Sequence, residues 1–487
     1  MNRPIRRVGY AVTVLILLLV AQLTYLQVVD ASRLAHDTRN VRGALKEYNR
    51  ARGEILTADG TIVAQSLPTT GDFKYIRTYP QVGLFAHTVG YQSFVDLVGS
   101  SGVENSYNDV LTGQDTSLQL KDIGGLFNGK STTNNVILTL TQSAQTAARD
   151  ALKNQPGSVV ALDLTSGAVL AMYSNPTFNP NGLSVHDTQF VQNSFNAINS
   201  GDKAALQRAY RDRYSPGSTF KVVTSKSAIE AGLATPDDPP FPEQDGFQIP
   251  GTNTTLFNFG GGGNPCGGTL RQSLINSCNA TFAALGYALD DQFPPAMDQC
   301  GINSAPPIDL SPAAVASVGP QVGADRPRFA LAGIGQGDVF TSPLQMALIA
   351  ASIGNGGTIM EPHVVKEIQN TDGKIVRPIA AKPWKTCMTP TTANAMTNMM
   401  LDVVNKGTGT AAQIDGVEVA GKTGTAQTTA GENPHAWFIA FAPANAPKYA
   451  VAVIVEHGGD FGSEATGGQV AAPIAKQVLQ NLLATNP

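Results

Sequence analysis

A long apolar run near the N-terminus sets the first constraint on how this chain can fold. Residues 8–29 are almost all apolar, and Arg3, Arg6 and Arg7 precede them. A helix needs about 20 apolar residues to cross the hydrocarbon layer, so the run predicts a transmembrane anchor over 8–29. Basic flanks stay in the cytoplasm, which predicts a cytoplasmic tail over 1–7 and an extracytoplasmic body. The alternative is a cleaved signal peptide, but the run is long for one and AQLTYLQ is a poor cleavage site.

Bulk properties exclude several classes of protein. The chain has 487 residues, of which 42% are hydrophobic, and its formal net charge is -4. This length predicts more than one domain, and the charge gives no signal for a nucleic-acid partner. We expect neither a metal nor another cofactor.

The cysteines are Cys266, Cys278, Cys300 and Cys387, and their spacing matches no metal-binding motif. An exported body permits disulfides, and four cysteines allow three full pairings. Cys266 and Cys278 flank a short segment that opens with glycines, which favours that pair. Four separate buried thiols are the alternative.

Strand and helix patterns divide the body near residue 156. Residues 30–155 alternate strand-like pieces with turns and predict a smaller N-terminal unit. Residues 158–174 have the apolar, β-branched runs and central turn of a hairpin. Helical blocks follow at 270–289 and 343–357, then three strands within 417–458 and an amphipathic helix over 467–483. For 156–487 we therefore expect an α/β (α+β) sandwich, with helices on both faces of an antiparallel sheet.

A serine and a lysine lie one helical turn apart at Ser218 and Lys221. Side chains three positions apart share a helix face, and a helix N-terminus favours developing negative charge on the serine oxygen. The lysine can take the hydroxyl proton only when it is neutral, which burial and a second nearby cation both promote. The same spacing recurs at Ser200 and Lys203, in a polar turn. A capping serine with an exposed lysine is the alternative for either pair.

A second group of residues, Lys422-Thr423-Gly424-Thr425, lies on a predicted strand. The glycine lets another segment approach the strand backbone closely. Lys422 can supply the second cation, and the hydroxyls of Thr423 and Thr425 can bind a carboxylate. The backbone N–H groups of Thr425 and Ser218 can together hold an oxyanion. The alternative is an exposed strand end.

The third group is Ser277-Cys278-Asn279, inside a predicted helical block. The pattern Ser-x-Asn also occurs at Ser106 and Ser194, so the tripeptide alone is uninformative. The copy at Ser277 stands between the other two motifs in the chain. A capping serine and a helix-breaking asparagine are the alternatives.

The order S-x-x-K, S-x-N, K-T-G is characteristic of penicillin-binding proteins and class A β-lactamases. The chain resembles class B penicillin-binding proteins over nearly its whole length. The matching stretches are 52–64 and 102–113 in a pedestal domain, and 167–181, 214–221, 333–357 and 435–443 in a transpeptidase domain. The first of these lacks the usual Asp-Arg before its glycine turn.

This resemblance assigns a role to each motif residue. Ser218 would be the acylated nucleophile, Lys221 its general base, Ser277 a proton relay and Asn279 a binder of the substrate backbone. The residues that would hold the terminal carboxylate are Lys422, Thr423, Gly424 and Thr425. A disulfide between Cys266 and Cys278 would clamp the rim of the active site.

The resemblance also implies a substrate and partners. The substrate would be the D-Ala-D-Ala end of a peptidoglycan stem peptide, cross-linked to a neighbouring stem, and β-lactams would inhibit covalently. Residues 30–155 are too few for a glycosyltransferase domain, so a multi-spanning glycan polymerase would supply the strands, docked on the anchor and pedestal. The alternatives are a membrane-bound D,D-carboxypeptidase, a β-lactamase, a β-lactam sensor and a scaffold without activity.

Overall fold

A five-stranded antiparallel sheet forms the centre of the larger unit. Its strand order is β15-β16-β17-β5-β6, so the first hairpin after residue 156 pairs with the last strand of the chain. The strands are β5 (Gly157–Asp163), β6 (Val169–Asn175), β15 (Ala420–Ala426), β16 (His435–Ala442) and β17 (Tyr449–Val455). All seven residues of β17 are buried, because helices cover both faces of the sheet.

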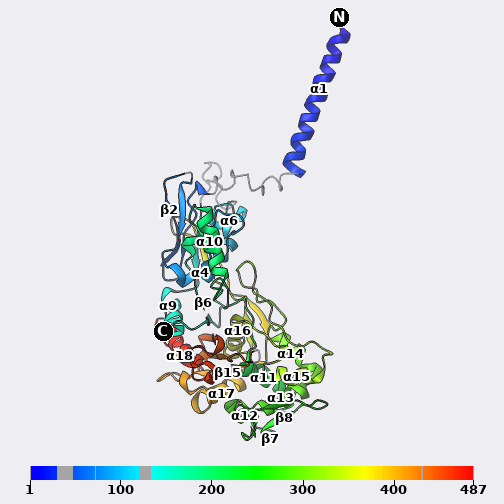
Figure 1. Cartoon of the computed structure of the whole chain (residues 1–487), viewed down its shortest axis with the longest axis vertical. Helices are drawn as coiled ribbons and strands as arrows, with labels where there is room; N and C mark the ends of the chain where they lie inside the picture. The colour runs from blue at the N-terminus through cyan, green and yellow to red at the C-terminus, as the bar shows by residue number, and fades with distance from the viewer. Residues whose placement is uncertain (1, 30–47, 72, 120–132, 429–430, 486–487) are drawn as a thin grey trace.

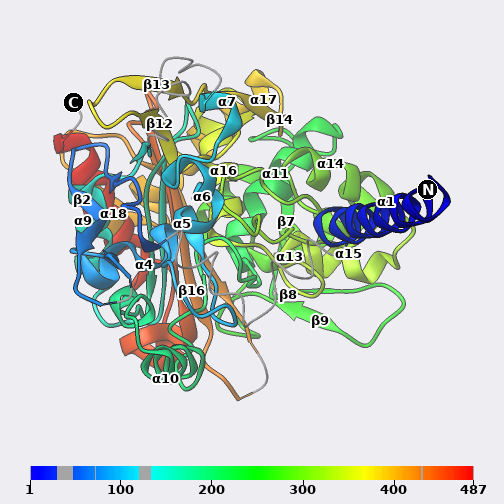
Figure 2. The same cartoon turned by 90° about the horizontal axis from the view of Figure 1, so that it is seen from above.

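Helices from distant parts of the chain cover this sheet. The helices α9 (Gln142–Leu152) and α18 (Ala471–Thr485) pack together on one face, and α16 (Pro343–Gly354) packs on β5 and β17 from the other. Figure 2 shows the sheet nearly edge-on between these two layers. The predicted α/β sandwich with an antiparallel sheet is therefore confirmed.

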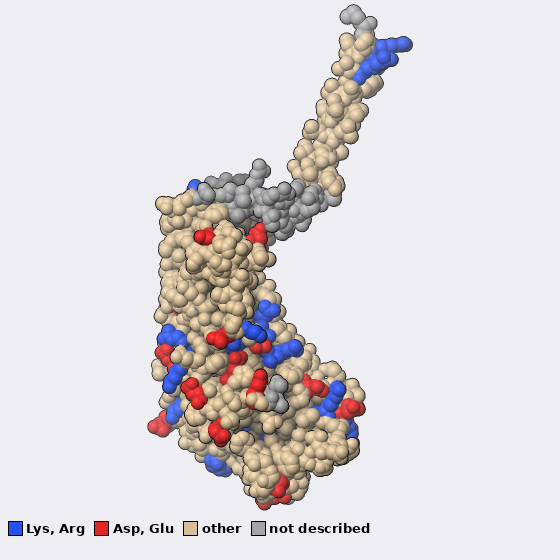
Figure 3. All heavy atoms as spheres, viewed as in Figure 1, with Lys and Arg blue, Asp and Glu red and all other residues tan. Residues whose placement is uncertain are grey.

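The structure is a computed structural model that describes residues 2–29, 48–71, 73–119, 133–428 and 431–485. Figure 1 shows an elongated body with the smaller N-terminal unit at one end and the larger unit at the other. One helix in these ranges is long and apolar enough to cross a membrane: α1 (Asn2–Thr24), which continues as a π-helix (Tyr25–Val29). Its basic end is visible in Figure 3.

The smaller unit is built on a six-stranded sheet of order β13-β12-β4-β1-β2-β3. Four strands come from the N-terminal part: β1 (Ile55–Leu56), β2 (Ile62–Pro68), β3 (Tyr75–Thr78) and β4 (Asn135–Leu138). The other two, β12 (Val365–Gln369) and β13 (Ile375–Pro378), come from the middle of the chain. The sheet of the smaller unit contains strands from before and after residue 155. The domain boundary predicted at this residue therefore stays a prediction.

The remaining elements are short strands, 3-10 helices and further α-helices. The short strands are β7 (Phe241–Gln244), β8 (Gly246–Gln248), β9 (Thr255–Phe257), β10 (Cys266–Gly268), β11 (Thr358–Met360) and β14 (Pro383–Thr386). The 3-10 helices include η4 (Gly217–Phe220) and η7 (Glu456–Glu464). The other helices are α4 (Ala86–Val89), α5 (Gly102–Ser106), α6 (Asn108–Leu111), α7 (Thr116–Gln119), α10 (Thr188–Asn199), α11 (Lys221–Glu230), α12 (Leu270–Asn276), α13 (Asn279–Leu289), α14 (Phe293–Gln299), α15 (Arg326–Gly333) and α17 (Pro390–Lys406).

A buried ionic cluster holds the smaller unit together. The carboxylate of Glu104 accepts hydrogen bonds from Arg77 Nε at 2.5 Å and from Arg52 Nη2 at 3.1 Å, and all three side chains are buried. Burial alone would raise the pKa of Glu104, but the charges of Arg77 and Arg52 outweigh burial, and the pKa lies below its ordinary value. The cluster therefore depends on all three partners being present.

We predict that Glu104→Ala lowers the unfolding temperature of the protein by at least about 5 °C. Removing one member of a buried ionic cluster leaves uncompensated charge and costs about 3–5 kcal/mol. Thermal unfolding followed by circular dichroism measures the shift. The exposed Asp96 offers a control, since Asp96→Ala should shift the midpoint by about 1 °C or less. Equal shifts in the two variants would show that the cluster contributes no stability.

Candidate active site

The three sequence motifs meet at one cleft of about 1340 Å³. Strand β15 forms one wall, the junction of α12 and α13 another, and the segment that follows β8 a third. Ser218, Ser277, Asn279 and the stretch from Thr423 to Thr425 all line this cleft. The repeated Ser-x-x-Lys copy does not contribute, because Ser200 and Lys203 lie exposed after α10.

Ser218 lies on η4, immediately before α11 begins at Lys221. The segment was expected to be helical from Ser218 onward, and its first turn is a 3-10 helix. Two glycines allow η4 to press against β15: a Cβ at Gly217, whose φ is +54°, would meet the Thr425 carbonyl oxygen at 2.7 Å, and one at Gly424 would meet Thr219 Cγ2 at 2.9 Å. The nucleophile candidate is thus held directly against the Lys-Thr-Gly strand.

Lys221 is fully buried, and its amine is fixed by two short hydrogen bonds. Its Nζ donates to the Ser277 carbonyl oxygen at 2.7 Å and to Asn279 Oδ1 at 2.7 Å. A neutral amine has two N–H groups and one lone pair, so two acceptors occupy both hydrogens and leave the lone pair for a proton. Lys221 and Ser218 are both described, and the structure shows no hydrogen bond between the Lys221 amine and the Ser218 hydroxyl. Such catalytic contacts are often long without substrate.

Ser277 connects the two buried amines. Its Oγ lies 3.3 Å from Lys221 Nζ and accepts a hydrogen bond from Lys422 Nζ at 2.9 Å. Ser277 has left-handed backbone angles, φ 60° and ψ 42°, which end α12 and turn the chain so that α13 begins at Asn279. The helical block expected over 270–289 is therefore two helices, and the break carries the site residues.

Electrostatics favour a neutral Lys221. The pKa of Lys221 lies well below its ordinary value of 10.5. Burial is the larger cause of this shift, and the charge of Lys422 is the smaller one. Burial also lowers the pKa of Lys422, to about 7. Lys422 was expected to stay cationic; with this pKa it is cationic below about pH 7 and loses the charge above it.

Asn279 couples the amines to the wall formed by β9 and the residues after it. Its Oδ1 accepts from Lys221, while its Nδ2 donates to the Phe257 carbonyl oxygen at 2.8 Å. The adjacent Ala280 N–H donates to Asn258 Oδ1 at 3.0 Å. One amide N–H of Asn279 thus holds the cleft wall, and its second N–H makes no hydrogen bond to another described residue.

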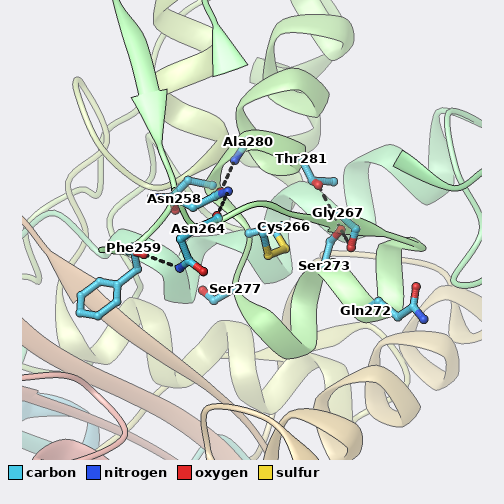
Figure 4. The surroundings of a disulfide bond; sticks show 12 residues. Asn258, Phe259, Asn264, Cys266, Gly267, Gln272, Ser273, Ser277, Ala280 and Thr281 are labelled. Atoms are coloured by element: carbon cyan, nitrogen blue, oxygen red, sulfur yellow. Dashed lines mark hydrogen bonds between the residues drawn. A yellow bond between two sulfur atoms is a disulfide. The ribbon is translucent and has the colours of Figure 1, made fainter. Parts of the chain in front are cut away.

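A disulfide reinforces the same wall. Cys266 at the start of β10 is bonded to Cys278 between Ser277 and Asn279, with the two Cα atoms 5.4 Å apart. Figure 4 shows this bridge beside Ser277, with Asn258 and Asn264 hydrogen-bonded across the loop. A second disulfide, which the sequence did not single out, joins Cys300 to Cys387 away from the cleft.

Some lining residues carry no sequence motif. Thr408 Oγ1 lies 2.6 Å from Thr423 Oγ1, so it orients the hydroxyl expected to bind a carboxylate. Phe257 and Phe259 line the cleft and are half or more exposed, at 50% and 66%. Glu432 lines it beyond the end of β15. These residues belong to none of the three motifs, and no local pattern in the sequence marks them as part of a site.

A half-buried serine in a cleft, with a buried amine of lowered pKa behind its wall, has the groups that acyl transfer through a covalent intermediate uses. Fold and site together define the class of serine acyltransferases. The family model described as "Penicillin binding protein transpeptidase domain" matches residues 157–480, and "Penicillin binding protein A dimerisation domain" matches residues 52–137. The chain belongs to the penicillin-binding protein transpeptidase family.

Two curated relatives match essentially the whole chain. It is 38% identical to peptidoglycan D,D-transpeptidase PbpA of Mycolicibacterium smegmatis over 98% of both chains. It is 35% identical to the protein of that name from Mycobacterium tuberculosis, over 100% of both chains.

Solved structures agree with this placement. The ceftriaxone acyl-enzyme complex of penicillin-binding protein A from M. tuberculosis matches with a TM-score of 0.83 and 33% identity, covering 90% of this chain and 100% of that one. The penicillin G acyl-enzyme complex of the same protein matches with a TM-score of 0.81 over 89% of this chain and 100% of that one, also at 33% identity.

We predict that Lys422→Met raises the unfolding temperature most at about pH 7 and below. The folded protein releases the Lys422 proton near pH 7, whereas the unfolded chain keeps it up to about its ordinary pKa of 10.5. Between these values the unfolded state binds more protons, so the free energy of unfolding of the native protein rises with pH. Methionine removes the cost of the buried charge, about 1–4 kcal/mol, and the gain shrinks as the pH approaches 10.5.

The control for this prediction is the exposed Lys448, since Lys448→Met should leave the unfolding temperature close to that of the native protein at every pH. Differential scanning fluorimetry from pH 6 to 10 makes the comparison. A gain in Lys422→Met that is independent of pH, or that grows with pH, would contradict the assignment of a depressed pKa to this amine.

Proposed function

We propose that this chain is a peptidoglycan D,D-transpeptidase whose Ser218 attacks the D-Ala-D-Ala end of a stem peptide. The family membership, the relatives named D,D-transpeptidase and the β-lactam acyl-enzymes of a protein with the same fold support the reaction. The assignment of roles to the residues rests on one observation. The Lys221 amine is buried behind a cleft that Ser218 lines, and two acceptors bind the two N–H groups that this amine would have when neutral.

In the first step the Ser218 oxygen attacks the carbonyl carbon of the penultimate D-Ala. Lys221 takes the hydroxyl proton, and the N–H groups of Ser218 and Thr425 stabilise the oxyanion. The carbon–nitrogen bond then breaks. The departing D-Ala amine receives a proton from Lys221 through Ser277, which lies between the two buried amines.

Substrate orientation follows from the strand on the opposite wall. The terminal carboxylate is held by the hydroxyls of Thr423 and Thr425, with the Lys422 charge behind them and Gly424 allowing the close approach of η4. The second N–H of Asn279 binds the donor backbone. A β-lactam presents a strained amide and a carboxylate to the same groups, which explains covalent inhibition.

In the second step the amine of a neighbouring stem peptide attacks the acyl-enzyme. Lys221 accepts the amine proton, and Ser218 recovers its own proton as the ester bond breaks. The two stems are then joined by a new amide bond. Neither step uses a metal or a cofactor.

The cell-membrane arrangement is part of the proposal. We infer that α1 anchors the protein with residues 1–7 in the cytoplasm and the cleft outside, because its basic residues precede the apolar stretch. Glycan strands would come from a multi-spanning polymerase that docks on the anchor and the smaller unit.

We predict that Ser218→Ala abolishes the covalent adduct with penicillin, because the acyl bond forms on its oxygen. Intact mass spectrometry of the full chain in detergent, followed by peptide mapping, measures the adduct. The native protein should gain the mass of one penicillin on the peptide containing Ser218 and keep it for hours, which separates a transpeptidase from a β-lactamase.

The chain provides a matched control for this experiment in its second Ser-x-x-Lys copy. Ser200→Ala should acylate like the native protein, since Ser200 is exposed and does not line the cleft. A penicillin adduct that still forms on Ser218→Ala would contradict the assignment of Ser218 as the nucleophile.

A further inference from the structure

Glu432 is the sole charged residue lining the catalytic cleft within the described ranges. The other lining residues are neutral, and the lysines of the site lie fully buried behind the walls. Thr429 and Ala430, which lie outside the described residues, carry no charge either. A single carboxylate in an otherwise neutral cleft attracts the positively charged group of a ligand to itself, because no other charged residue lines the walls.

Described residues on both sides of Glu432 make defined contacts. Thr428 Oγ1 donates to the Asn433 carbonyl oxygen at 3.0 Å. His435 and His457 pack ring against ring at 4.8 Å, and the His457 N–H donates to His435 Nδ1 at 3.0 Å. Glu432 Oε2 lies 3.9 Å from His457 Nδ1, beyond hydrogen-bond distance, so the carboxylate keeps its capacity to accept from a ligand.

The proposed reaction fixes the direction of the donor peptide along β15. Its terminal carboxylate lies at Thr423 and Thr425, and its scissile carbonyl lies at the N–H groups of Thr425 and Ser218. The preceding residues of the donor must therefore continue past Thr425 toward Gln427 and Thr428, antiparallel to β15. Both of these residues line the cleft, and each donor residue advances about 3.3 Å.

The donor itself must carry an amine on this side. In the proposed reaction the attacking amine belongs to a neighbouring stem, and a donor stem and an acceptor stem are copies of one peptide. The donor therefore has the same amine, on a residue that precedes D-Ala-D-Ala. At neutral pH that amine is an ammonium ion. A donor that runs past Thr425 toward Thr428 brings this ammonium toward the segment that contains Glu432.

We propose that Glu432 binds this side-chain ammonium of the donor stem and selects donors in which the amine is still free. The inference rests on the proposed transpeptidase function and adds a specificity residue to it. Glu432 acts on binding and does not touch the reacting atoms, so its effect falls on KM more than on kcat.

The test uses the full chain in detergent and three synthetic donors of sequence Nα-acetyl-Lys-D-Ala-D-Ala. In one the lysine side chain is free, in the second it is acetylated, and in the third it is succinylated and therefore anionic. D-Ala release and competition with a fluorescent penicillin give the kcat/KM of each donor. Penicillin labelling itself reports whether Ser218 is still reactive in each variant.

The native protein should prefer the free amine over the acetylated one by about three- to tenfold, as expected for a partly exposed ion pair. Glu432→Gln should abolish this preference, mainly through KM, and Glu432→Lys should prefer the succinylated donor. Glu464 is an exposed acid on η7 outside the cleft, so Glu464→Gln should keep the native preference.

Two results would overturn the proposal: an unchanged preference in Glu432→Gln, or an equal loss for all three donors. The failure of the proposed function is a different result, because the native protein would then release D-Ala from none of the donors, whether or not penicillin labels Ser218.

Discussion

The burial of two amines around one hydroxyl is the interaction on which this active site depends. Lys221 and Lys422 are both fully buried, and both lie next to Ser277 Oγ. Neither amine contacts a carboxylate among the described residues, so each protonation is opposed by burial and, for Lys221, by the other amine. The same burial that costs the fold energy lowers the pKa of both amines, and in the proposed mechanism it prepares Lys221 to act as the base.

The surrounding structure keeps that arrangement from relaxing. Ser277 has left-handed backbone angles between two helices, and the disulfide from Cys278 to Cys266 fastens the turn to the next wall. Asn279 Oδ1 accepts the second N–H of the Lys221 amine, and Asn279 Nδ2 donates to the Phe257 carbonyl oxygen of the wall. A lysine with looser contacts could swing to solvent and regain its proton.

Local sequence patterns predict the parts of the fold that depend on neighbours in the chain. The hairpin of β5 and β6, the three C-terminal strands and the terminal helix all follow from apolar periodicity and turn residues. The joining of β12 and β13 to the sheet of the smaller unit does not, because strand pairing between residues far apart leaves no periodic trace. The break at Ser277 was also missed, since a serine in left-handed conformation looks like any other serine in sequence.

The same distinction applies to the site. The residues of the three motifs were predicted from their order in the chain, and the structure brings them to one cleft. Thr408 orients Thr423, and Glu432 lies in the segment after β15. Neither belongs to a motif, and both reach the cleft only through folding. The roles of Thr408 and Glu432 depend on the residues that surround them in the folded protein, and a single sequence does not reveal these neighbours.

The protonation state of Lys221 tests this account most directly. Lysine labelled with ¹⁵N at Nζ, followed by NMR as the pH is raised, reports when each amine becomes neutral, and Lys221→Arg identifies the signal. We expect the Lys221 amine to lose its proton well below 10.5, and to do so at a higher pH once Lys422→Met removes the neighbouring charge. A Lys221 signal that stays cationic until the bulk of the surface lysines titrate would contradict the mechanism.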